Sequence, residues 1–596
     1  MTTEDASPQL TWTEEGEPRS GRFGDVYFSR DDGLAETRAV FLNGCGLPDT
    51  WAGRRRFTVA ELGFGTGLNI AALLTLWQAH RPEGGRLHIF SIEGFPLTAD
   101  EARRALSNWP ELSEAAQALT NAWPSGTPGF HRLDLPGFNA VLDLAVGDAE
   151  WALREWSGQA DAWFLDGFSP ALNPGMWSPE VMEQIAARSA PGARVATFTV
   201  AGTVRRGLAE RGFAVEKMPG HGRKRERLEA RLPSPPAEES TPSVAVIGVG
   251  IAGASVVRAL MAEGVTPLVF EGERPGAGGS GFPSGLVTPR LDAGDMGIAG
   301  LFAQALERAR DLYRATPDAI IAEGVLQLPQ AERDVTRHAK IAAQPLWPAG
   351  AMTVISAYDA SELIGEPTST GGLLMSGTCA VKPAVILSAW LGDTHVIKTS
   401  VTRIEKSDAG WRLFNGDAVL AEVETVVLTA GWGSADLLGQ LDTAPGLSPV
   451  RGQANWTSGS APAPVAWGGY AAPTEDGLLF GATHDRGDTS TEVREADMAR
   501  NLATLEQRLP QLAASVRGSG SINARAAIRA TTADRLPLAG ALTQGLFILG
   551  GLGSRGLSAA PLLGEHIATQ ITGAPSPMPE MLASRLDPLR AAVARS

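Results

Sequence analysis

Residues 243–271, SVAVIGVGIAGASVVRALMAEGVTPLVFE, decide the fold of the C-terminal half of this chain. Val244–Ile247 is a short apolar, β-branched run, which is typical of a buried parallel strand. Gly248, Gly250 and Gly253 follow it at G-x-G-x-x-G spacing, and helical periodicity continues beyond them. A strand that runs through such a turn into a helix is the first half of a βαβ unit that binds a dinucleotide.

Each position of this motif has a mechanical reason. Gly248 permits the tight turn from strand to helix, Gly250 lets a pyrophosphate approach the backbone, and Gly253 lets helix and strand pack closely. A second apolar run ends in Glu271, 18 residues after Gly253, where a carboxylate can accept the ribose hydroxyls. Because strand, glycines, helix, second strand and acid agree, we interpret the stretch as a dinucleotide site rather than as a glycine-rich turn.

Length and composition bound the class of protein. The chain has 596 residues, enough for two to four domains, and a hydrophobic fraction of 43%, which suits globular cores. Its formal net charge of −15 argues against a uniformly basic nucleic-acid surface but allows a local basic patch. Cys45 and Cys379 are the only cysteines, which excludes a disulfide framework and a cysteine-rich zinc site, and we expect no metal.

A second glycine-rich turn lies in the N-terminal half. Phe57–Glu61 is a predicted strand, and it runs into the segment ELGFGTGLN, residues 61–69, with glycines at positions 63, 65 and 67. This segment resembles the first motif of class I S-adenosylmethionine-dependent methyltransferases. The resemblance implies that Glu61, Gly63, Gly65 and Gly67 lie at the methionine part of that cofactor.

Acidic residues follow the next three predicted strands. Glu93, Asp148 and Asp166 come after strands expected at 87–92, 140–146 and 161–165. In an open parallel sheet such strand ends converge on one crevice. Glu93 is placed for the ribose hydroxyls and Asp148 for the adenine amino group. Ordinary helix caps and turn residues are the alternative, which the repetition after successive strands disfavours.

The linker between the two halves is rich in proline, serine and glutamate and poor in apolar residues, LPSPPAEESTP at 232–242. We therefore expect one domain at 1–232, which the resemblance above implies is a methyltransferase, a linker at 233–242 and a second domain at 243–596. The second domain resembles FAD-dependent oxidoreductases, which implies FAD-binding parts at about 243–300, 425–435 and 520–575, with a substrate-binding subdomain between them. The predicted fold class is α/β, a class I Rossmann-like domain followed by an FAD-binding Rossmann domain with an α+β subdomain.

The roles of two groups of side chains in the N-terminal half remain open at this point. The first is a basic region in an otherwise acidic chain, either a nucleic-acid contact or a solvated face, formed by Arg205, Arg206, Arg211, Lys217, His221, Arg223, Lys224, Arg225 and Arg227. The second is a set of aromatic residues, expected to pack rather than to hold a flat substrate, formed by Trp12, Phe23, Tyr27, Phe28 and Phe41.

Nine segments occur in an order that resembles one family. They are ELGFGTGLN, SIEGFPL, FLDGFSPALNPGMW, GHGRKRE, VAVIGVGIAGAS, LSPVRGQ, GATHDRGD, IRATTADRLPLAG and GLGSRGLSAAPLLGE, and they span roughly residues 20–570. Together they resemble the bifunctional tRNA 5-methylaminomethyl-2-thiouridine biosynthesis family (MnmC type). The C-terminal half resembles the FAD-dependent D-amino-acid oxidase and glycine oxidase family.

The resemblance implies two consecutive steps on the wobble uridine of tRNA. The FAD half removes the carboxymethyl group of 5-carboxymethylaminomethyl-2-thiouridine, and the methyltransferase half then methylates the amine with S-adenosyl-L-methionine. Arg529 and Arg555 match arginines that hold a carboxylate in the oxidase family. Gly431 and Gly553 match cofactor-binding turns, and FAD is expected to be non-covalent because no cysteine lies near the last turn.

For methyl transfer, Asp166 is expected to accept the amine proton or to orient the lone pair of the amine. Asn173, Pro174 and Trp177 are expected to shape a slot for the base, Trp177 by stacking; the alternative is a rigid loop over the cofactor. Cys379 has no assigned chemistry, and His221 and His484 are interpreted as ordinary polar residues.

Two other functions remain as alternatives. The first is a fused amine oxidase and N-methyltransferase that acts on a free small amine or amino acid. The second is a binding module in which one half is inactive and only docks RNA. No apolar run reaches about 18 residues, and the polar N-terminus lacks signal-peptide character, so we expect a cytoplasmic protein without membrane or DNA contact.

Overall fold

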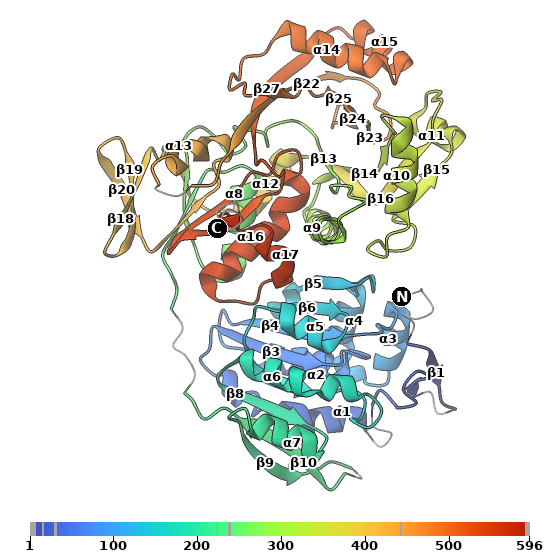
Figure 1. Ribbon diagram of the computed structural model, residues 1–596, viewed down its shortest axis with the longest axis vertical. Coiled ribbons are helices and arrows are strands. Elements are labelled where there is room, and N and C mark those ends of the chain that lie inside the picture. The colour runs from blue at the N-terminus through green and yellow to red at the C-terminus, as the bar shows by residue number, and fades with distance from the viewer. Residues whose placement is uncertain are drawn as a thin grey trace. The chain divides into compact units, whose positions relative to one another are not determined.

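The computed structural model describes residues 8–14, 17–28, 32–222, 224–235, 240–441 and 444–590. The chain divides into two compact units (Figure 1). The first contains residues 1–240 with 573–580, and the second contains residues 241–572 with 581–596. Residues 236–239 of the expected linker lie outside the described part.

An eight-stranded sheet forms the centre of the first unit. Its strand order is β5 (Gly129–Leu135), β6 (Ala140–Val146), β4 (Arg86–Glu93), β3 (Arg56–Leu62), β7 (Ala160–Leu165), β8 (Ser189–Thr197), β10 (Glu226–Arg231) and β9 (Ala214–Pro219). Strands β6, β4, β3, β7 and β8 are parallel, and β5, β10 and β9 are antiparallel to their neighbours. The order reverses at β3, so the crevice beyond the carboxyl ends of β3 and β7 is the natural ligand site.

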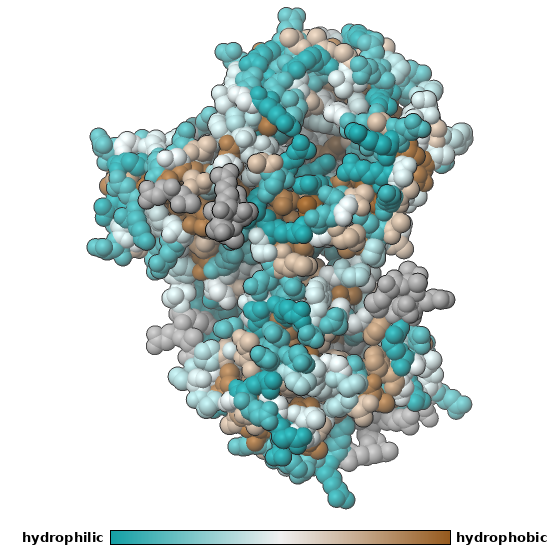
Figure 2. All heavy atoms as spheres, viewed as in Figure 1, coloured by the Kyte–Doolittle hydropathy of each residue, from teal (hydrophilic) through white to brown (hydrophobic). Residues whose placement is uncertain are grey.

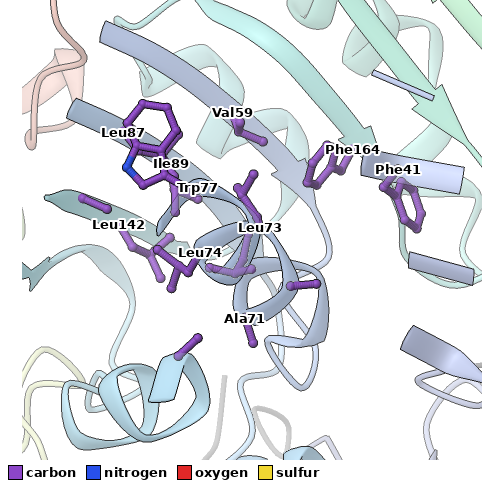
Figure 3. Packing of buried hydrophobic residues seen from close by; sticks show 14 of the residues in the cluster. Phe41, Val59, Ala71, Leu73, Leu74, Trp77, Leu87, Ile89, Leu142 and Phe164 are labelled. Carbon is purple, nitrogen blue, oxygen red and sulfur yellow. The ribbon is translucent and has the colours of Figure 1, made fainter. Parts of the chain in front are cut away.

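Helices cover both faces of this sheet (Figure 1). They are α1 (Gly33–Glu36), α2 (Leu68–His80), α3 (Ala99–Leu106), α4 (Ser113–Asn121), α5 (Ala149–Glu155), α6 (Pro179–Ala187) and α7 (Gly202–Ala209). Helix α2 follows the glycine turn and is buried on several sides: Leu73, Leu74 and Trp77 pack in one cluster with Val59 and Ile89 of the sheet (Figure 3). Each such fully buried side chain contributes roughly 1.5–3 kcal/mol, which holds the glycine turn in place against the sheet.

The second unit contains the predicted dinucleotide fold. A six-stranded sheet runs in the order β17 (Val396–Lys398), β12 (Leu268–Glu271), β11 (Val244–Ile247), β21 (Thr425–Leu428), β29 (Leu546–Gly550) and β28 (Leu538–Thr543). All neighbours are parallel except β28 and β29. Helices α8 (Ile251–Ala262) and α16 (Gly556–Thr572) pack together beside it.

A larger mixed sheet of ten strands completes the second unit. Its path is β13 (Gly285–Val287), β16 (Gly372–Val381), β14 (Ile320–Gln327), β23 (Val465–Ala466), β24 (Tyr470–Pro473), β25 (Gly477–Gly481), β22 (Ser448–Ser458) and β26 (Asp485–Arg486), with β15 (Met352–Ile355) on β16 and β27 (Asn523–Thr531) on β22. The sequence grouped β27 with the FAD-binding parts, whereas its nine paired residues place it in this sheet. β27 therefore places Arg529 in the ten-stranded sheet, opposite Val450 of β22.

The remaining elements of the second unit surround these sheets. A separate three-stranded sheet consists of β18 (Arg403–Ser407), β19 (Gly410–Asn415) and β20 (Ala418–Val423). The helices are α9 (Met296–Arg314), α10 (Glu332–Ala342), α11 (Ala357–Ile364), α12 (Pro383–Leu391), α13 (Ser434–Leu438), α14 (Glu495–Glu506), α15 (Pro510–Gly518) and α17 (Glu580–Ser584).

Among the described residues, no helix is long and apolar enough to cross a membrane. On the face shown in Figure 2, hydrophilic residues cover most of the area and apolar residues are scattered among them.

Candidate active sites

A cavity of about 730 Å³ opens at the carboxyl ends of the strands in the first unit. Its wall includes Gly63 and Gly65 after β3, Glu93 after β4, Asp148 after β6 and Asp166 after β7. The structure therefore brings together residues that four separate strand ends supplied. Its volume lies in the range of about 300–1,000 Å³ that small-molecule sites occupy.

The glycine turn of this cavity requires glycine at Gly63. Its φ of +90° lies in the region that other residues rarely adopt, and a Cβ there would lie 3.0 Å from Gly167 Cα. The backbone of Gly63 thus passes directly against the turn that follows Asp166. Gly67 does not line the cavity; it caps the N-terminus of α2.

Glu93 holds the glycine turn and still faces the cavity. Its Oε2 accepts from the Gly65 amide at 2.9 Å, and its Oε1 accepts from the Phe95 amide at 2.8 Å. Each carboxylate oxygen has a second lone pair, so Glu93 can also accept the hydroxyls of a bound ribose. Asp148 has a similar double use, because it lines the cavity and caps α5 by accepting from the Trp151 amide at 2.9 Å.

Asp166 is held in place by an asparagine that we did not assign from the sequence. Asn69 Nδ2 donates to Asp166 Oδ2 at 2.8 Å and to Glu61 Oε1 at 3.0 Å, while Asn69 Oδ1 accepts from Thr37 Oγ1 at 2.8 Å. Because Thr37 fixes the amide orientation, both Asn69 hydrogens point at carboxyl groups. Asn69 stands in the quoted motif ELGFGTGLN, but its role needs the three-dimensional fold to be seen.

Burial changes the protonation of both carboxyl groups on Asn69. It raises the pKa of Asp166 to about 6, against the opposing effect of the Gly167 amide and Asn69. It raises the pKa of Glu61 to about 8, although Ser91 and Asn69 donate to that carboxyl group. Asp166 is therefore mostly a carboxylate at pH 7 and Glu61 mostly a neutral acid.

Glu61 does not line the cavity, in contrast to the role that we expected for it at the cofactor. Only 1% of the residue is exposed, and Ser91 Oγ donates to its Oε2 at 2.6 Å. The structure places Glu61 behind Asn69, so Glu61 reaches the site only through that amide.

Aromatic side chains form much of the cavity wall. Phe23, Tyr27, Phe28 and Phe41, which we expected to pack, line the cavity together with Phe168. Phe23 and Phe168 contact each other with ring centroids 4.7 Å apart and ring planes tilted by 32°. These rings surround the space with flat apolar surface of the kind on which a nucleobase stacks.

Trp177 has a structural place instead of the stacking role that the sequence suggested. It is buried with 5% exposure, and its Nε1 donates to the Phe168 carbonyl at 3.0 Å. It therefore anchors the loop that carries Phe168, while Asn173 does line the cavity.

The basic region divides between the cavity and ion pairs outside its wall, of which Lys217–Glu226 is exposed and Arg227–Glu229 is partly buried. His221 and Lys224 line the cavity. Lys217 pairs with Glu226 at 2.7 Å and Arg227 with Glu229 at 2.6 Å. Arg223 lies outside the described residues.

The second glycine turn closely matches its sequence interpretation. At Gly248, with φ of +97°, a Cβ would lie 2.5 Å from Ala430 Cα. At Gly253 a Cβ would lie 2.0 Å from the Gly248 oxygen, so strand and helix touch there as the motif predicts. Gly250 is the N-cap of α8, and among the described atoms beyond its own helix and chain neighbours, Ser280 Oγ is the one within 4 Å of where its Cβ would lie.

Glu271 acts on its turn in the same way as Glu93. Its Oε2 accepts from the Val249 amide at 2.8 Å, and its Oε1 accepts from the Glu273 amide at 3.1 Å. In both units the acid after the second strand thus fixes the glycine turn and keeps lone pairs for ribose hydroxyls. This second role of the acids was not visible in the sequence.

Gly248→Ala should give a protein that purifies without flavin and melts at a lower temperature. The new methyl group would meet Ala430 in a backbone conformation that costs alanine about 1–2 kcal/mol even without the clash. The flavin absorbance of the purified protein and its thermal melt measure this. Gly520→Ala is the matched control, because open space surrounds that position. Normal flavin content in Gly248→Ala would show that the close approach to Ala430 is not needed.

A second cavity, of about 940 Å³, lies in the second unit beside the turn after β29. Among its described lining residues are the acids Asp292 and Asp334 and the five arginines Arg290, Arg337, Arg486, Arg535 and Arg555. His338 and His484 also line it, and burial lowers the pKa of both imidazoles, so they add little charge at pH 7. The cavity therefore favours anionic ligands.

Arg555 lines this cavity and is held in place by a side-chain hydrogen bond. It donates to Thr288 Oγ1, and burial lowers its pKa to about 10, so it remains a cation at pH 7. Gly553 lies in the same turn with φ of +54° and also lines the cavity. An arginine fixed by one hydrogen bond keeps further N–H groups for a carboxylate.

Arg529 and Gly431 lie elsewhere. Arg529 is on β27 and does not line the 940 Å³ cavity; its Nη1 would be 2.6 Å from a Cβ at Gly452, and its charge acts on Tyr470 and His484. Gly431, with φ of +59°, lies just beyond the carboxyl end of β21, a central strand of the dinucleotide sheet. Arg486 and Arg535, which stand in quoted motifs but were not assigned, are in the cavity wall instead.

Comparisons with known proteins agree with the predicted assignment of both halves of the chain. The S-adenosyl-L-methionine-dependent methyltransferase family matches residues 110–233, and the FAD dependent oxidoreductase family matches residues 243–570. The tRNA 5-methylaminomethyl-2-thiouridine biosynthesis bifunctional protein MnmC of Caulobacter sp. (strain K31) is 54% identical, over 99% of this chain and 98% of its own. The protein of the same name from Thiobacillus denitrificans is 37% identical over 97% of each chain.

The chain belongs to this family. It is a bifunctional enzyme with an N-terminal methyltransferase domain and a C-terminal FAD-dependent oxidoreductase domain.

Among solved structures, glycine oxidase from Geobacillus kaustophilus is similar to the C-terminal half. Its TM-score is 0.52 at 19% identity, and the match covers 59% of this chain and 99% of that one. This likeness confirms the FAD-binding fold that residues 243–271 predicted.

The residues of both sites fit the cofactors of this family, S-adenosyl-L-methionine and FAD. In the first unit the Gly63–Gly65 turn, Glu93 and Asp148 line one cavity that can take the methyl donor. In the second unit the open backbone at Gly250 and the N-terminus of α8 suit a pyrophosphate. Cys379 is buried, with its pKa raised by burial to about 12, so its thiol is a poor candidate for a covalent flavin link.

Proposed function

We propose that this enzyme completes 5-methylaminomethyl-2-thiouridine at the wobble position of tRNA in two steps. The oxidoreductase domain removes the carboxymethyl group of 5-carboxymethylaminomethyl-2-thiouridine and leaves the 5-aminomethyl base. The methyltransferase domain then methylates that amine. We propose the cytoplasm as the setting and RNA, rather than DNA, as the polymer that is modified.

The observation that carries this proposal is the contrast between the cavities. One is lined by arginines beside the turn at Gly551 and Gly553 after β29, and the other holds Asp166 beside the turn at Gly63 and Gly65. The first step needs a site for a carboxylate and the second a site for an amine.

In the first step the substrate carries the group –NH–CH2–COO⁻. Arg555 is placed to bind the carboxylate through its free N–H groups and so to orient the CH2. Bound FAD supplies the hydride acceptor for this carbon. The resulting imine is cleaved by water to glyoxylate and the aminomethyl base. His338 and His484 also line the cavity and are largely neutral at pH 7, so they leave the arginine charge available to the substrate.

In the second step the amine must lose a proton before it can attack. An aliphatic ammonium has a pKa near that of lysine, about 10, so it enters the site protonated. The carboxylate of Asp166, held by Asn69 and the Gly167 amide, is placed to accept that proton and to align the lone pair. Bound S-adenosyl-L-methionine supplies the methyl group.

Flavin reduction tests the substrate class. Under anaerobic conditions, tRNA that carries 5-carboxymethylaminomethyl-2-thiouridine should bleach the flavin absorbance of the enzyme, and free glycine or sarcosine should not. Bleaching by the free amino acids and not by tRNA would replace this proposal with a fused amine oxidase and N-methyltransferase. An absence of bleaching by either would point to an inactive oxidoreductase half.

The double variant Arg486→Ala/Arg535→Ala should weaken tRNA binding more at low salt than at high salt. Both side chains are exposed in the cavity wall, and the described structure shows no hydrogen bond or ion pair of either guanidinium. If each contacts one phosphate, the slope of log K against log salt falls by about 0.7 per contact. The KM for tRNA at a series of salt concentrations measures the slope.

Arg412→Ala is the control for this salt series, because Arg412 is an exposed arginine of the separate three-stranded sheet, paired with Glu422. An unchanged slope in the double variant would remove both arginines from the tRNA contact.

A further inference from the structure

The cavity of the first unit is strongly acidic. Six carboxyl groups belong to its wall: Asp25, Glu36, Glu93, Asp148, Glu150 and Asp166. Among the described lining residues, Lys224 is the one lysine, and no arginine lines the cavity. This charge pattern is the reverse of that in the arginine-lined cavity of the second unit.

The one lysine is already neutralised. Lys224 Nζ donates to Glu36 Oε1 at 2.8 Å, and the same Nζ lies 4.1 Å from the ring centroid of Phe198. Glu36 is the more enclosed partner, since its side chain is 13% exposed and that of Lys224 is 46% exposed. The ion pair therefore lies in the cavity wall with the lysine charge already paired to a carboxylate.

The ion pair lies on the substrate side, within electrostatic reach of Asp166. Lys224 lowers the pKa of Asp166, and Glu36 raises it. Asp25 belongs to the same side, since its Oδ2 accepts from the amide of Ser169, three residues beyond Asp166, at 3.4 Å. Glu93 and Asp148, by contrast, follow β4 and β6 on the cofactor side.

The chemistry of methyl transfer alone does not order the two steps. The carboxymethylated substrate is a secondary amine, and its nitrogen lone pair is able to attack a methyl donor just as that of the primary amine is. Methylation before oxidation would give a tertiary amine that still carries the carboxylate. Removal of the carboxymethyl group from that tertiary amine would also give the methylaminomethyl base, so the order of the two steps is fixed only if the methyltransferase site rejects the carboxylated amine.

We propose that the Lys224–Glu36 ion pair, with Asp25 and Asp166, is the specificity device that excludes the carboxylated amine from the methyltransferase cavity. Glu36 neutralises the one lysine that would otherwise hold the carboxylate, and the surrounding carboxylates repel it. The same charges attract the ammonium of the aminomethyl product. The order of the steps then follows from the charge of the two cavities. This inference deepens the proposed function and rests on it.

Glu36→Gln should turn this exclusion into acceptance. It removes one repelling charge and leaves Lys224 free to pair with the carboxylate of the substrate. At separations of a few ångströms in a partly buried site, these two changes favour the carboxylated amine by tenfold or more, an order of magnitude that follows from Coulomb's law at an effective dielectric constant of about 20.

The experiment uses the full chain with FAD and S-adenosyl-L-methionine, kept anaerobic, with an excess of tRNA that carries 5-carboxymethylaminomethyl-2-thiouridine. Mass spectrometry of the nucleosides detects a methylated base that retains its carboxymethyl group. The wild-type enzyme should give at most a trace, and Glu36→Gln should form this product at least about tenfold faster. A parallel assay on tRNA with the aminomethyl base measures ordinary methyl transfer.

Glu226→Gln is the matched control. It breaks the Lys217–Glu226 ion pair, which has a similar length of 2.7 Å but lies outside the cavity wall. It should behave like the wild type with both substrates. Should Glu36→Gln fail to fold, Asp25→Asn carries the same prediction through the loss of one repelling charge.

Three results separate the proposals. If the wild-type enzyme methylates carboxylated and aminomethyl tRNA equally well, the exclusion does not exist. If Glu36→Gln, or Asp25→Asn in its place, methylates aminomethyl tRNA but still rejects the carboxylated tRNA, the ion pair is not its cause. If the wild-type enzyme methylates neither tRNA, the proposed function itself fails.

Discussion

Asp166→Asn should slow methyl transfer to aminomethyl tRNA by about 100-fold or more, while tRNA still reduces the flavin at the wild-type rate. An amide cannot accept the ammonium proton, and a positioned general base contributes about 10²- to 10⁴-fold. The substitution keeps the size of the side chain and its acceptor oxygen for Asn69, so the cavity should keep its form. Rates of methyl incorporation and of flavin reduction, measured on the same preparation, check that the first falls and that the second stays unchanged.

The same residue predicts the pH dependence of the wild-type enzyme. Because burial raises the pKa of Asp166 to about 6, the base is protonated below that pH, and the methyl-transfer rate should fall about tenfold per pH unit there. The charged and polar groups that face Asp166 are Glu61 through Asn69, Glu36 and Lys224. Glu61 is already neutral at that pH and should not add a second inflection near 6.

A flat profile between pH 5 and 8 in the wild type, or wild-type methyl transfer by Asp166→Asn, would remove Asp166 from the proton transfer. Rates should be compared at saturating S-adenosyl-L-methionine, so that cofactor binding does not mimic the effect.

Arg555→Ala should raise the KM for carboxymethylaminomethyl tRNA about 10- to 100-fold and leave methyl transfer to aminomethyl tRNA unchanged. A hydrogen bond to a charged group contributes about 1.5–3 kcal/mol, and a bidentate guanidinium contact lies in the upper part of that range. Arg555 is held by Thr288 and lines the cavity beside Gly553, which makes it the best placed of our two predicted carboxylate ligands. Steady-state kinetics of glyoxylate release measure the change.

Arg529→Ala is the informative comparison, because the sequence proposed the same role for Arg529. Its guanidinium lies over Gly452, outside the cavity wall, so we expect a smaller rise in KM than for Arg555→Ala. If Arg529→Ala has the larger effect, the carboxylate site belongs on the β22–β27 side of the fold and the two arginines exchange roles.

The two nucleotide folds could be predicted because local sequence decides them. In each half a β-branched run, a glycine turn and a helix follow one another directly, and the structure has them at the predicted places. Gly248 and Gly253 meet backbone atoms where the motif says that nothing larger than hydrogen fits. Glu93 and Glu271 stand at the predicted strand ends, and both prove also to hold their own glycine turns.

The arrangement of the sites could not be predicted in the same way, because distant segments build them. Thr37, Asn69 and Asp166 meet only after the sheet has formed, as do Glu36 and Lys224, which are 188 residues apart. No local pattern marks such pairs. Arg486 and Arg535 stood in recognised motifs, yet their common cavity depends on the pairing of β22 with β26 and β27.

Two side chains were misjudged for a related reason. Glu61 is an acid at a strand end, which suggested a cofactor contact. Asn69 of α2 lies between Glu61 and the cavity and donates to the Glu61 carboxyl group. Trp177 is an aromatic residue in a loop near the site, but its indole N–H is used by the Phe168 carbonyl. Burial decided both cases, and burial is a property of the folded chain rather than of a short segment.

The nucleosides formed by the Asp166→Asn enzyme test the central claim most directly. This variant, supplied with FAD, S-adenosyl-L-methionine and carboxymethylaminomethyl tRNA in air, should convert the base to 5-aminomethyl-2-thiouridine and stop there, and wild-type enzyme should carry it on to the methylaminomethyl base. If the variant instead leaves the carboxymethyl group in place, or still delivers the methylated base, the two cavities do not act in turn on one amine.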